Sequence, residues 1–177
     1  MAFPQKEIGL YKATAVHGDR ASQNVILYTG GNYITDGSVC VGDFVWRKTQ
    51  ADGTVTVTNI GADATSAGGA TKPLGIVERI QTYVIANLNK GATMVLEEKT
   101  PVTVAVSGPF YLQTSTEARP DDEVYFPNAP SKDGLNQIAC VHKGGSAPAG
   151  YTKMAGWVCT SVASAGEVVR VTNQEVA

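Results

Sequence analysis

Two histidines, His17 and His142, are the side chains of this sequence that suit acid–base chemistry near neutral pH. Neither has a His or Cys partner at metal-ligand spacing, and the chain contains neither H-x-x-x-H nor C-x-x-C. A G-x-S-x-G motif is also missing, so a Ser-His-Asp triad would have to use one of only two histidines. The sequence therefore predicts no zinc site and no hydrolase, and it places His142 at the surface after the strand that holds Cys140.

Paired carboxylates are the next candidates for general acid–base work or for calcium binding. They occur at Asp121-Asp122-Glu123, which follows Arg119-Pro120 in a turn, and at Glu97-Glu98, which precedes Lys99. Solvated charges in turns and at strand edges explain both groups, and the D-x-[DN]-x-[DN]-G calcium pattern is absent. We expect no catalytic residue, no metal and no cofactor.

The three cysteines, Cys40, Cys140 and Cys159, are odd in number, widely spaced and set among Val, Ala or Thr. This pattern indicates buried free thiols rather than a disulfide framework.

Composition and charge narrow the class of protein. The 177 residues carry a formal charge of -2 and 17% charged residues, below the roughly 25% of ordinary globular domains. Without a basic patch the chain is expected to bind neither nucleic acid nor a membrane surface. No apolar run reaches the roughly 18–20 residues that span a bilayer, and the N-terminus lacks a signal-peptide pattern, so synthesis in a cytoplasm is expected.

The elements that must position any site are predicted to be strands. Thr54–Thr58 alternates Val with Thr, which is the period of a half-buried strand, and Asp52-Gly53 before it is a hairpin signal. Further strands are predicted at Asn24–Tyr28, Ser38–Val41, Phe44–Arg47, Leu74–Ile80, Thr93–Glu97, Val102–Val106, Phe110–Thr114, Val124–Phe126, Gln137–Val141, Gly156–Thr160 and Glu167–Thr172. Gln81–Lys90 fits a strand or a helix. About a dozen short strands predict an all-β fold, either a compact barrel or a tulip-like sandwich.

An internal repeat is predicted within a single β-domain over residues 23–177. Asp43-Phe-Val-Trp46 matches Asp122-Glu-Val-Tyr125 at an offset of 79 residues, and Thr71–Val77 matches Thr152–Val158 at an offset of 81. The two modules would span residues 38–97 and 118–172, each with a strand kinked at Gly75 or Gly156. The alternative is that two β-rich halves share turn residues by chance.

Aromatic residues could form a sugar-binding platform, but in β-rich chains they more often fill the core. We expect Trp46 and Trp157 in the core, because both lie in the repeated strands. Tyr11 and Tyr33 lie outside the repeat and are better candidates for contacts with a partner.

Several motifs in fixed order carry a resemblance to a known family. Val41-Gly42 before Asp43–Trp46, the Leu74–Val77 strand, Pro101–Gly108, Pro120–Tyr125 and Gly156–Val171 together resemble the structural cement, or capsid decoration, proteins of tailed bacteriophages. The similarity covers most of residues 38–172. Gln81–Lys99 departs from it, since this segment is longer than the short connection expected there.

The resemblance implies a non-enzymatic virion protein on the outer surface of an assembled capsid. It would bridge major capsid subunits against the pressure of packaged DNA, as a homo-oligomer, dimer or trimer. The alternatives are the base domain of a head fibre or tail-associated virion protein, or a β-barrel that binds carbohydrate or another small ligand.

Residues 1–22 are predicted to be an N-terminal arm or the first strand of the domain. In the arm, the apolar residues Phe3, Pro4, Ile8, Leu10 and Tyr11 alternate with charged residues and could lie along a capsid subunit by strand addition. With Tyr33 they are the predicted capsid contacts. In the alternative, Ile8–Val16 simply joins the domain's own sheet.

Overall fold

The computed structural model describes residues 15–22, 25–65, 68–80, 94–131 and 134–174. The predicted strand Ile8–Val16, the arm residues before it and Gln81–Lys90 lie wholly or largely outside these ranges. No α-helix occurs in the described part of the chain, which contains two 3-10 turns, η1 (Gly61–Asp63) and η2 (Gly69–Thr71). The all-β prediction is confirmed.

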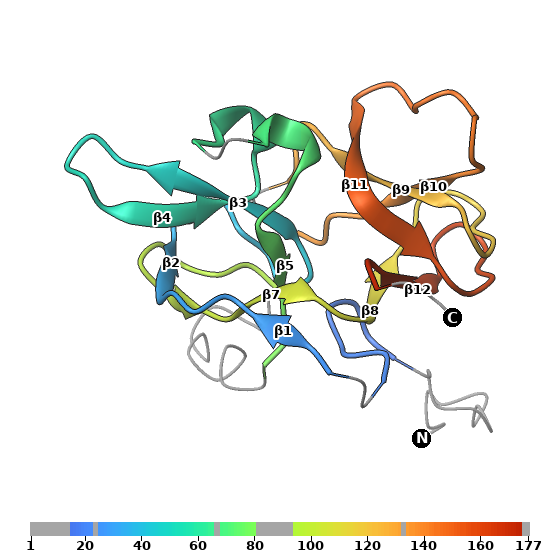
Figure 1. Cartoon of the computed structure of the whole chain (residues 1–177), viewed down its shortest axis with the longest axis horizontal. Coiled ribbons are helices and arrows are strands. Elements are labelled where there is room, and N and C mark those ends of the chain that lie inside the picture. Colours follow the sequence, from blue (N-terminus) through green and yellow to red (C-terminus); the bar gives the residue numbers. More distant parts are fainter. Residues whose placement is uncertain (1–14, 23–24, 66–67, 81–93, 132–133, 175–177) are drawn as a thin grey trace, which may run out of the picture.

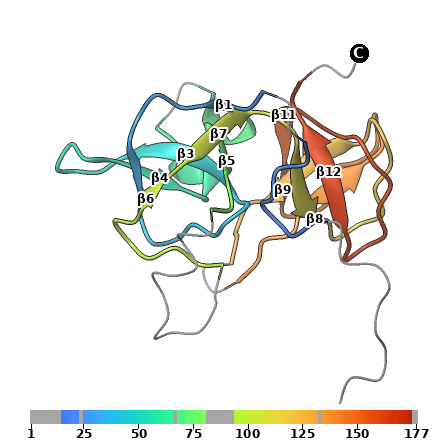
Figure 2. The same cartoon turned by 90° about the horizontal axis from the view of Figure 1, so that it is seen from below.

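The strands form two sheets that lie side by side in both views of the molecule (Figures 1 and 2). The first sheet has the order β1-β7-β5-β3-β4-β2-β6 and is built from β1 (Leu27–Tyr28), β2 (Tyr33–Thr35), β3 (Phe44–Thr49), β4 (Val55–Thr58), β5 (Gly75–Val77), β6 (Pro101–Val102) and β7 (Val104–Ser107). The second has the order β10-β9-β11-β12-β8 and is built from β8 (Phe110–Gln113), β9 (Glu123–Pro127), β10 (Ala139–Val141), β11 (Tyr151–Cys159) and β12 (Val168–Thr172).

The sheets are not closed into a barrel, which corrects that part of the predicted architecture. The end strands β1 and β6 of the first sheet do not pair with each other. In the second sheet, the region after β8 meets the region before β10 through an isolated bridge between Thr114 and Ile138 rather than through paired strands. Two predicted strands are also reduced to single bridges, because Ser38–Val41 and the described part of Thr93–Glu97 pair only through Cys40 and Val95.

The core has two parts. The inner face of the first sheet is lined mainly by valines, including Val45, Val57 and Val77. Aromatic rings fill the space between the sheets: Phe44 of β3 contacts Phe126 of β9 and Trp157 of β11 edge-on, with ring centroids 5.6 and 5.2 Å apart. The burial of these rings makes the main contribution to the free energy that holds the two sheets together.

Both tryptophans are in the core, as predicted, because Trp46 is 2% and Trp157 is 3% exposed. The three cysteines are buried thiols outside any disulfide of the described residues, as predicted.

The same turn occurs once in each sheet, just before β3 and just before β9. In the first, the Asp43 N–H donates to the Cys40 carbonyl (3.2 Å) and the Asp43 carboxylate accepts from the Cys40 N–H (2.8 Å). In the second, Asp122 makes the same two bonds with Arg119, at 3.2 and 2.8 Å. We refer to these as the first and second aspartate turns.

Each aspartate turn is bonded to the neighbouring strand in the same way. Gly42 N–H donates to Val77 O and Val77 N–H donates to Asp43 O, at 2.8 and 3.0 Å. In the second sheet, Asp121 N–H donates to Cys159 O and Cys159 N–H donates to Asp122 O, both at 2.9 Å. These paired bonds support the predicted repeat, which stays a prediction.

Candidate functional site

The predicted contact residues are only partly placed by the structure. Phe3, Pro4, Ile8, Leu10 and Tyr11 lie outside the described residues, and their role stays a prediction. Tyr33 in β2 is half-buried and packs against the valine-lined core of the first sheet. Only part of its ring is therefore available to a partner.

Residues 16–22, which we call the strap, bind both sheets. Gly18 N–H donates to Tyr111 O of β8 (2.7 Å), and the Gly18 carbonyl accepts from Arg79 N–H after β5 (3.0 Å). Arg79 also forms an ion pair with Asp19 (3.1 Å). The described end of the predicted arm is thus fixed across the junction of the two sheets.

His17 is the buried side chain of the strap. Its Nδ1 accepts a hydrogen bond from Gln113 N–H (2.9 Å), so the proton of the neutral ring lies on Nε2, which has no hydrogen-bond partner among the described residues. Burial lowers the pKa of His17 to about 4, because the charged form would lose its hydration. His17 is therefore a neutral packing residue, whereas His142 is at the surface, as predicted, with its side chain 84% exposed.

Arg20 of the strap, Tyr28 of β1 and Glu78 form a polar cluster. Arg20 forms an ion pair with Glu78 (Nε–Oε1, 2.5 Å) and donates to the Tyr28 hydroxyl, while that hydroxyl donates to Glu78 (2.6 Å). Burial, and then the hydrogen bond to Glu78, raise the pKa of Tyr28 to about 12. Tyr28 is thus a neutral donor that fixes the end of β1.

The first aspartate turn also joins the two halves of the chain. Asp43 is completely buried and accepts hydrogen bonds from the side-chain amides of Asn59 (2.7 Å) and Asn136 (2.9 and 3.0 Å). Asn136 belongs to the β9–β10 connection of the second sheet. Burial raises the pKa of Asp43 to about 7, against the lowering effect of the bonds from Cys40, Asn59 and Asn136. This arrangement is a structural joint, because the completely buried carboxyl group is bonded to side chains from both halves of the chain.

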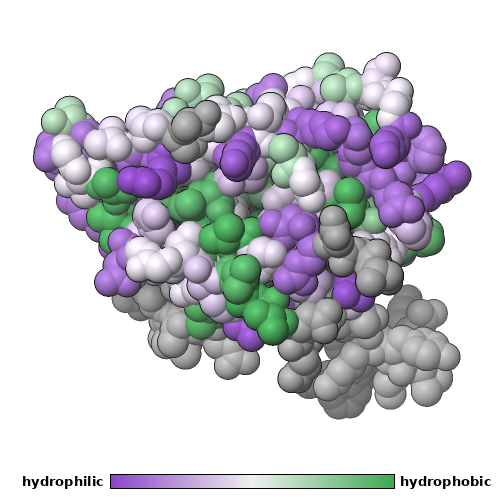
Figure 3. Space-filling view, in the orientation of Figure 1, coloured by the Kyte–Doolittle hydropathy of each residue, from purple (hydrophilic) through white to green (hydrophobic). Residues whose placement is uncertain are grey.

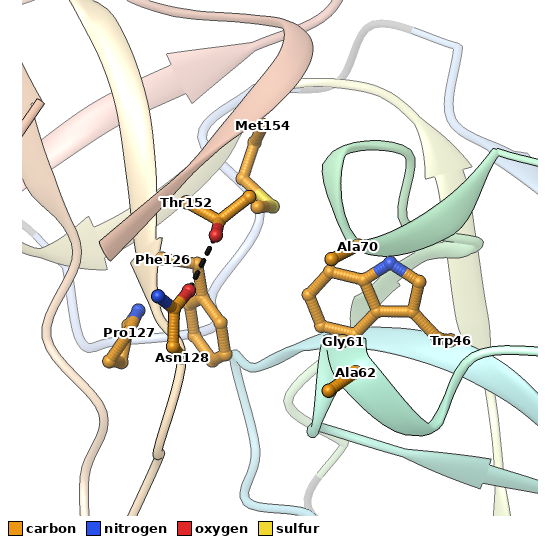
Figure 4. A pocket seen from close by; sticks show the side chains of 9 residues that line it. All are labelled: Trp46, Gly61, Ala62, Ala70, Phe126, Pro127, Asn128, Thr152 and Met154. Carbon is orange, nitrogen blue, oxygen red and sulfur yellow. Dashed lines mark hydrogen bonds between the residues drawn. The ribbon is translucent and has the colours of Figure 1, made fainter. Parts of the chain in front are cut away.

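A pocket of about 290 Å³ lies between the sheets (Figure 4). It is lined by Trp46, Gly61, Ala62, Ala70, Phe126, Pro127, Asn128, Thr152 and Met154. Its polar groups include Asn128 and Thr152, which hydrogen bond to each other (2.5 Å). The rings of Trp46 and Phe126 are 2% and 1% exposed, so neither presents a face on which a sugar could stack.

Within the described ranges, no three His, Cys, Asp or Glu side chains are grouped so that they could hold a metal ion. Of the carboxylates at 121–123, Asp122 serves the second aspartate turn and Glu123 forms an ion pair with Lys153 (2.6 Å). In the same ranges, no helix is long and apolar enough to cross a membrane.

Comparison with known proteins shows to which family the chain belongs. The profile of the XM1 gp53 minor capsid protein family matches residues 5–173, nearly the whole chain. The chain belongs to this family. The phage capsid resemblance read from the sequence is confirmed, and so is the prediction of a structural protein without enzymatic activity.

A solved structure agrees with the family assignment of this minor capsid protein. A chain in "The capsid of Myoviridae Phage XM1" matches with a TM-score of 0.58 and 19% identity, over 100% of this chain and 100% of that chain. At this identity the match shows a shared fold. No curated protein matches the sequence. The family assignment makes this minor capsid protein a component of a phage capsid.

Sequence reasoning missed one surface of this minor capsid protein. Val25 and Leu27 are 73% and 55% exposed, although Asn24–Tyr28 was expected to be an ordinary strand. The signal was present in the sequence: Val25, Ile26 and Leu27 put apolar side chains on both faces of one strand. Ile26 packs against the core, and the other face is left to solvent.

Proposed function

We propose that this minor capsid protein binds the outer surface of an assembled phage capsid and bridges neighbouring major capsid subunits, stabilising the shell against the pressure of packaged DNA. The observation that carries the proposal is the family match over residues 5–173, which covers both sheets and most of the predicted arm. Because the match covers nearly the whole chain, we expect both sheets to contribute to the role of a minor capsid protein.

The scaffold suits a clamp. The aromatic core between the sheets, the Asp43–Asn136 joint and the strap hold the two halves in one fixed arrangement. A rigid protein that contacts two subunits adds an interface that must break before the lattice opens. Because many copies act on one shell, modest affinity for each site is sufficient.

The contacts in this proposal are the arm residues Phe3, Pro4, Ile8, Leu10 and Tyr11, together with the exposed part of Tyr33. The described end of the predicted arm is the strap, and its bonds to Tyr111 and Arg79 fix it to both sheets. A homo-oligomer, dimer or trimer, at a local symmetry axis of the capsid is part of the proposal.

The test is co-sedimentation of the purified protein with expanded, empty capsids that lack it, measured as bound copies per major capsid subunit. We expect saturation at a fixed ratio, and binding to closed shells places the site on the outer surface. Absence of binding at micromolar protein contradicts the proposal and favours a fibre-base or tail-associated role.

Deleting residues 2–12 tests the arm separately. If the arm contacts the capsid, the shortened protein keeps its unfolding temperature and loses capsid affinity. If Ile8–Val16 is a strand of the domain's own sheet, the deletion lowers the unfolding temperature instead.

A further inference from the structure

Four of the six exposed large hydrophobic side chains in the described part of the chain lie in or next to two paired strands, and the other two are Val16 and Val162. Val25, Leu27 and Tyr28 lie in or next to β1, and Val106 lies in the paired strand β7. Figure 3 shows hydrophobic side chains clustered over these two strands. We call the four residues the edge surface, because β1 is the terminal strand of the first sheet.

Matching hydrogen bonds show which strands of the two sheets correspond. Asp36 N–H, after β2, donates to Val57 O (3.1 Å), and Ser115 N–H, after β8, donates to Ile138 O (2.7 Å). The aspartate turns follow at the same distance along the chain in both halves. β2 therefore corresponds to β8, β3 to β9, β4 to β10 and β5 to β11.

Among the strands of the described residues, β1 has no counterpart in the second sheet. β12 pairs with both β8 and β11, and the two equivalent pairings in the first sheet are made by β6 with β2 and by β7 with β5. These assignments account for every strand of the second sheet and leave β1 over. An added strand that only completed the framework would bury its apolar side chains, whereas Val25 and Leu27 are exposed.

The edge surface is held in place before any partner arrives. The Gln174 side chain donates to Val25 O and the Asn173 side chain donates to Val106 O, both at 2.8 Å. The Tyr28 hydroxyl is fixed by Glu78. A surface ordered in advance loses little conformational entropy on binding.

The charge and the size of the edge surface indicate the kind of partner that it binds. The edge surface contains no charged side chain, and the charges beside it, on Arg20 and Glu78, are paired with each other. An uncharged apolar partner fits this surface, since a charged one would be desolvated without a counter-ion. A stable dimer needs about 800 Å² and some 20–30 residues from each copy, and four residues fall far short of that.

From these observations we propose that the edge surface docks on an uncharged, apolar segment of the major capsid subunit. The inference rests on the proposed function, in which that subunit is the neighbour of this chain, and it adds a second contact to those of the arm. Two small contacts on one rigid scaffold reinforce each other, because the second binding event is intramolecular.

The experiment compares capsid binding by the wild-type protein, the double variant Val25→Lys/Leu27→Lys and the control Val162→Lys. Val162 is 72% exposed and lies after β11 in the second sheet, so the control adds a charge at an equally exposed apolar position away from β1. Each protein is titrated onto expanded, empty capsids, and its unfolding temperature and oligomeric state are measured in parallel.

We expect the double variant to bind at least tenfold more weakly and the control within twofold of wild type, with both variants folded. Equal binding by the folded double variant overturns the inference. So does unchanged capsid binding combined with loss of a wild-type oligomer, which assigns the edge surface to a second copy. Lack of binding by the wild-type protein instead overturns the proposed function, and the inference with it. If the double variant does not fold, Val106→Lys replaces it under the same criteria.

Discussion

The two aspartate turns have the same backbone bonds and different surroundings. Asp43 is completely buried, and its carboxyl group accepts from the amide of Asn59, which follows β4, and from that of Asn136 in the other half of the chain. The Asp122 carboxylate binds its own turn through Oδ2, while its Oδ1 has no hydrogen bond among the described residues and lies 3.4 Å from exposed His142. The first turn is therefore a joint between the sheets, and the second only shapes its own sheet.

The residue before each aspartate shows the same difference. Gly42 has a φ of +84°, and a Cβ built there would lie 2.2 Å from the ring of His17. Asp121 occupies the equivalent position with a φ of +69°. Only the first turn is packed against a buried side chain of the strap, so only there is glycine required by space as well as by φ.

The largest expected effect on stability comes from removing the Asp43 carboxyl group, which joins the two sheets. Asp43→Ala leaves the donors of Cys40, Asn59 and Asn136 buried without an acceptor, and we expect a loss of about 4 kcal/mol in the free energy of unfolding. Asp122→Ala should cost about 1–2 kcal/mol, because it orphans mainly the Arg119 N–H. Urea denaturation of both variants measures the difference, and equal losses contradict the assignment of the joint to the first turn.

Gly42→Ala is expected to cost about 3 kcal/mol, because it combines a left-handed φ with a clash against the His17 ring. Gly53→Ala is the matched control, since Gly53 has the same φ of +84° and nothing within 4 Å of the added methyl group. The excess loss of the first variant over the second, measured by urea denaturation, is the contribution of the strap. No excess means that His17 does not pack against this turn.

Acidification should change the stability contributions of the buried side chains His17 and Asp43 in opposite directions. The pKa of His17 is lowered from 6.5 to about 4, so its contribution to stability is present above pH 6.5 and is lost as the pH falls toward 4. The pKa of Asp43 is raised from 3.8 to about 7, so its contribution is present below pH 3.8 and is lost as the pH rises toward 7. The two contributions oppose each other in the wild-type protein.

His17→Gln should therefore remove about 2 kcal/mol of acid-induced destabilisation between pH 7 and pH 4.5, relative to wild type. His142→Gln, which changes an exposed histidine, should follow the wild-type pH profile. Unfolding free energies at the two pH values give the comparison. A His17→Gln profile parallel to that of wild type would contradict the lowered pKa of His17 in the folded protein.

The smallest expected effect is at Asp121. Replacement by glycine relieves a positive φ at a residue with a Cβ, and we expect a gain of about 0.5 kcal/mol or no change in stability. A clear loss in thermal denaturation would indicate that the Asp121 side chain has a structural role that Gly42 cannot share.

Short-range patterns in the sequence predicted much of this comparison. The all-β class, the core tryptophans and the matched aspartate turns follow from alternation and spacing within each half. The bond from Asn136 to Asp43 spans 93 residues, and no local pattern indicates it. His17 is buried by Gly42 and Gln113, which are close to it only in the folded chain, so it could not be distinguished from a surface residue of the arm.

The predicted contact sites were the least accessible to sequence reasoning. Tyr33 was predicted to be a capsid contact because it lies outside the repeat, yet it packs against the valine-lined core of the first sheet. The edge surface was overlooked because Asn24–Tyr28 matches a buried strand as well as a strand with one face left for a partner. Burial on one face depends on what covers β1, and that is set by the whole sheet.

The most direct test of the account is the temperature at which DNA-filled particles release their genome, with and without this protein. Particles assembled without it should release DNA at a lower temperature, and protein added from outside should restore the higher temperature as its sites fill. Equal release temperatures for the two kinds of particle, with the protein shown to be bound, would contradict the claim that it stabilises the shell.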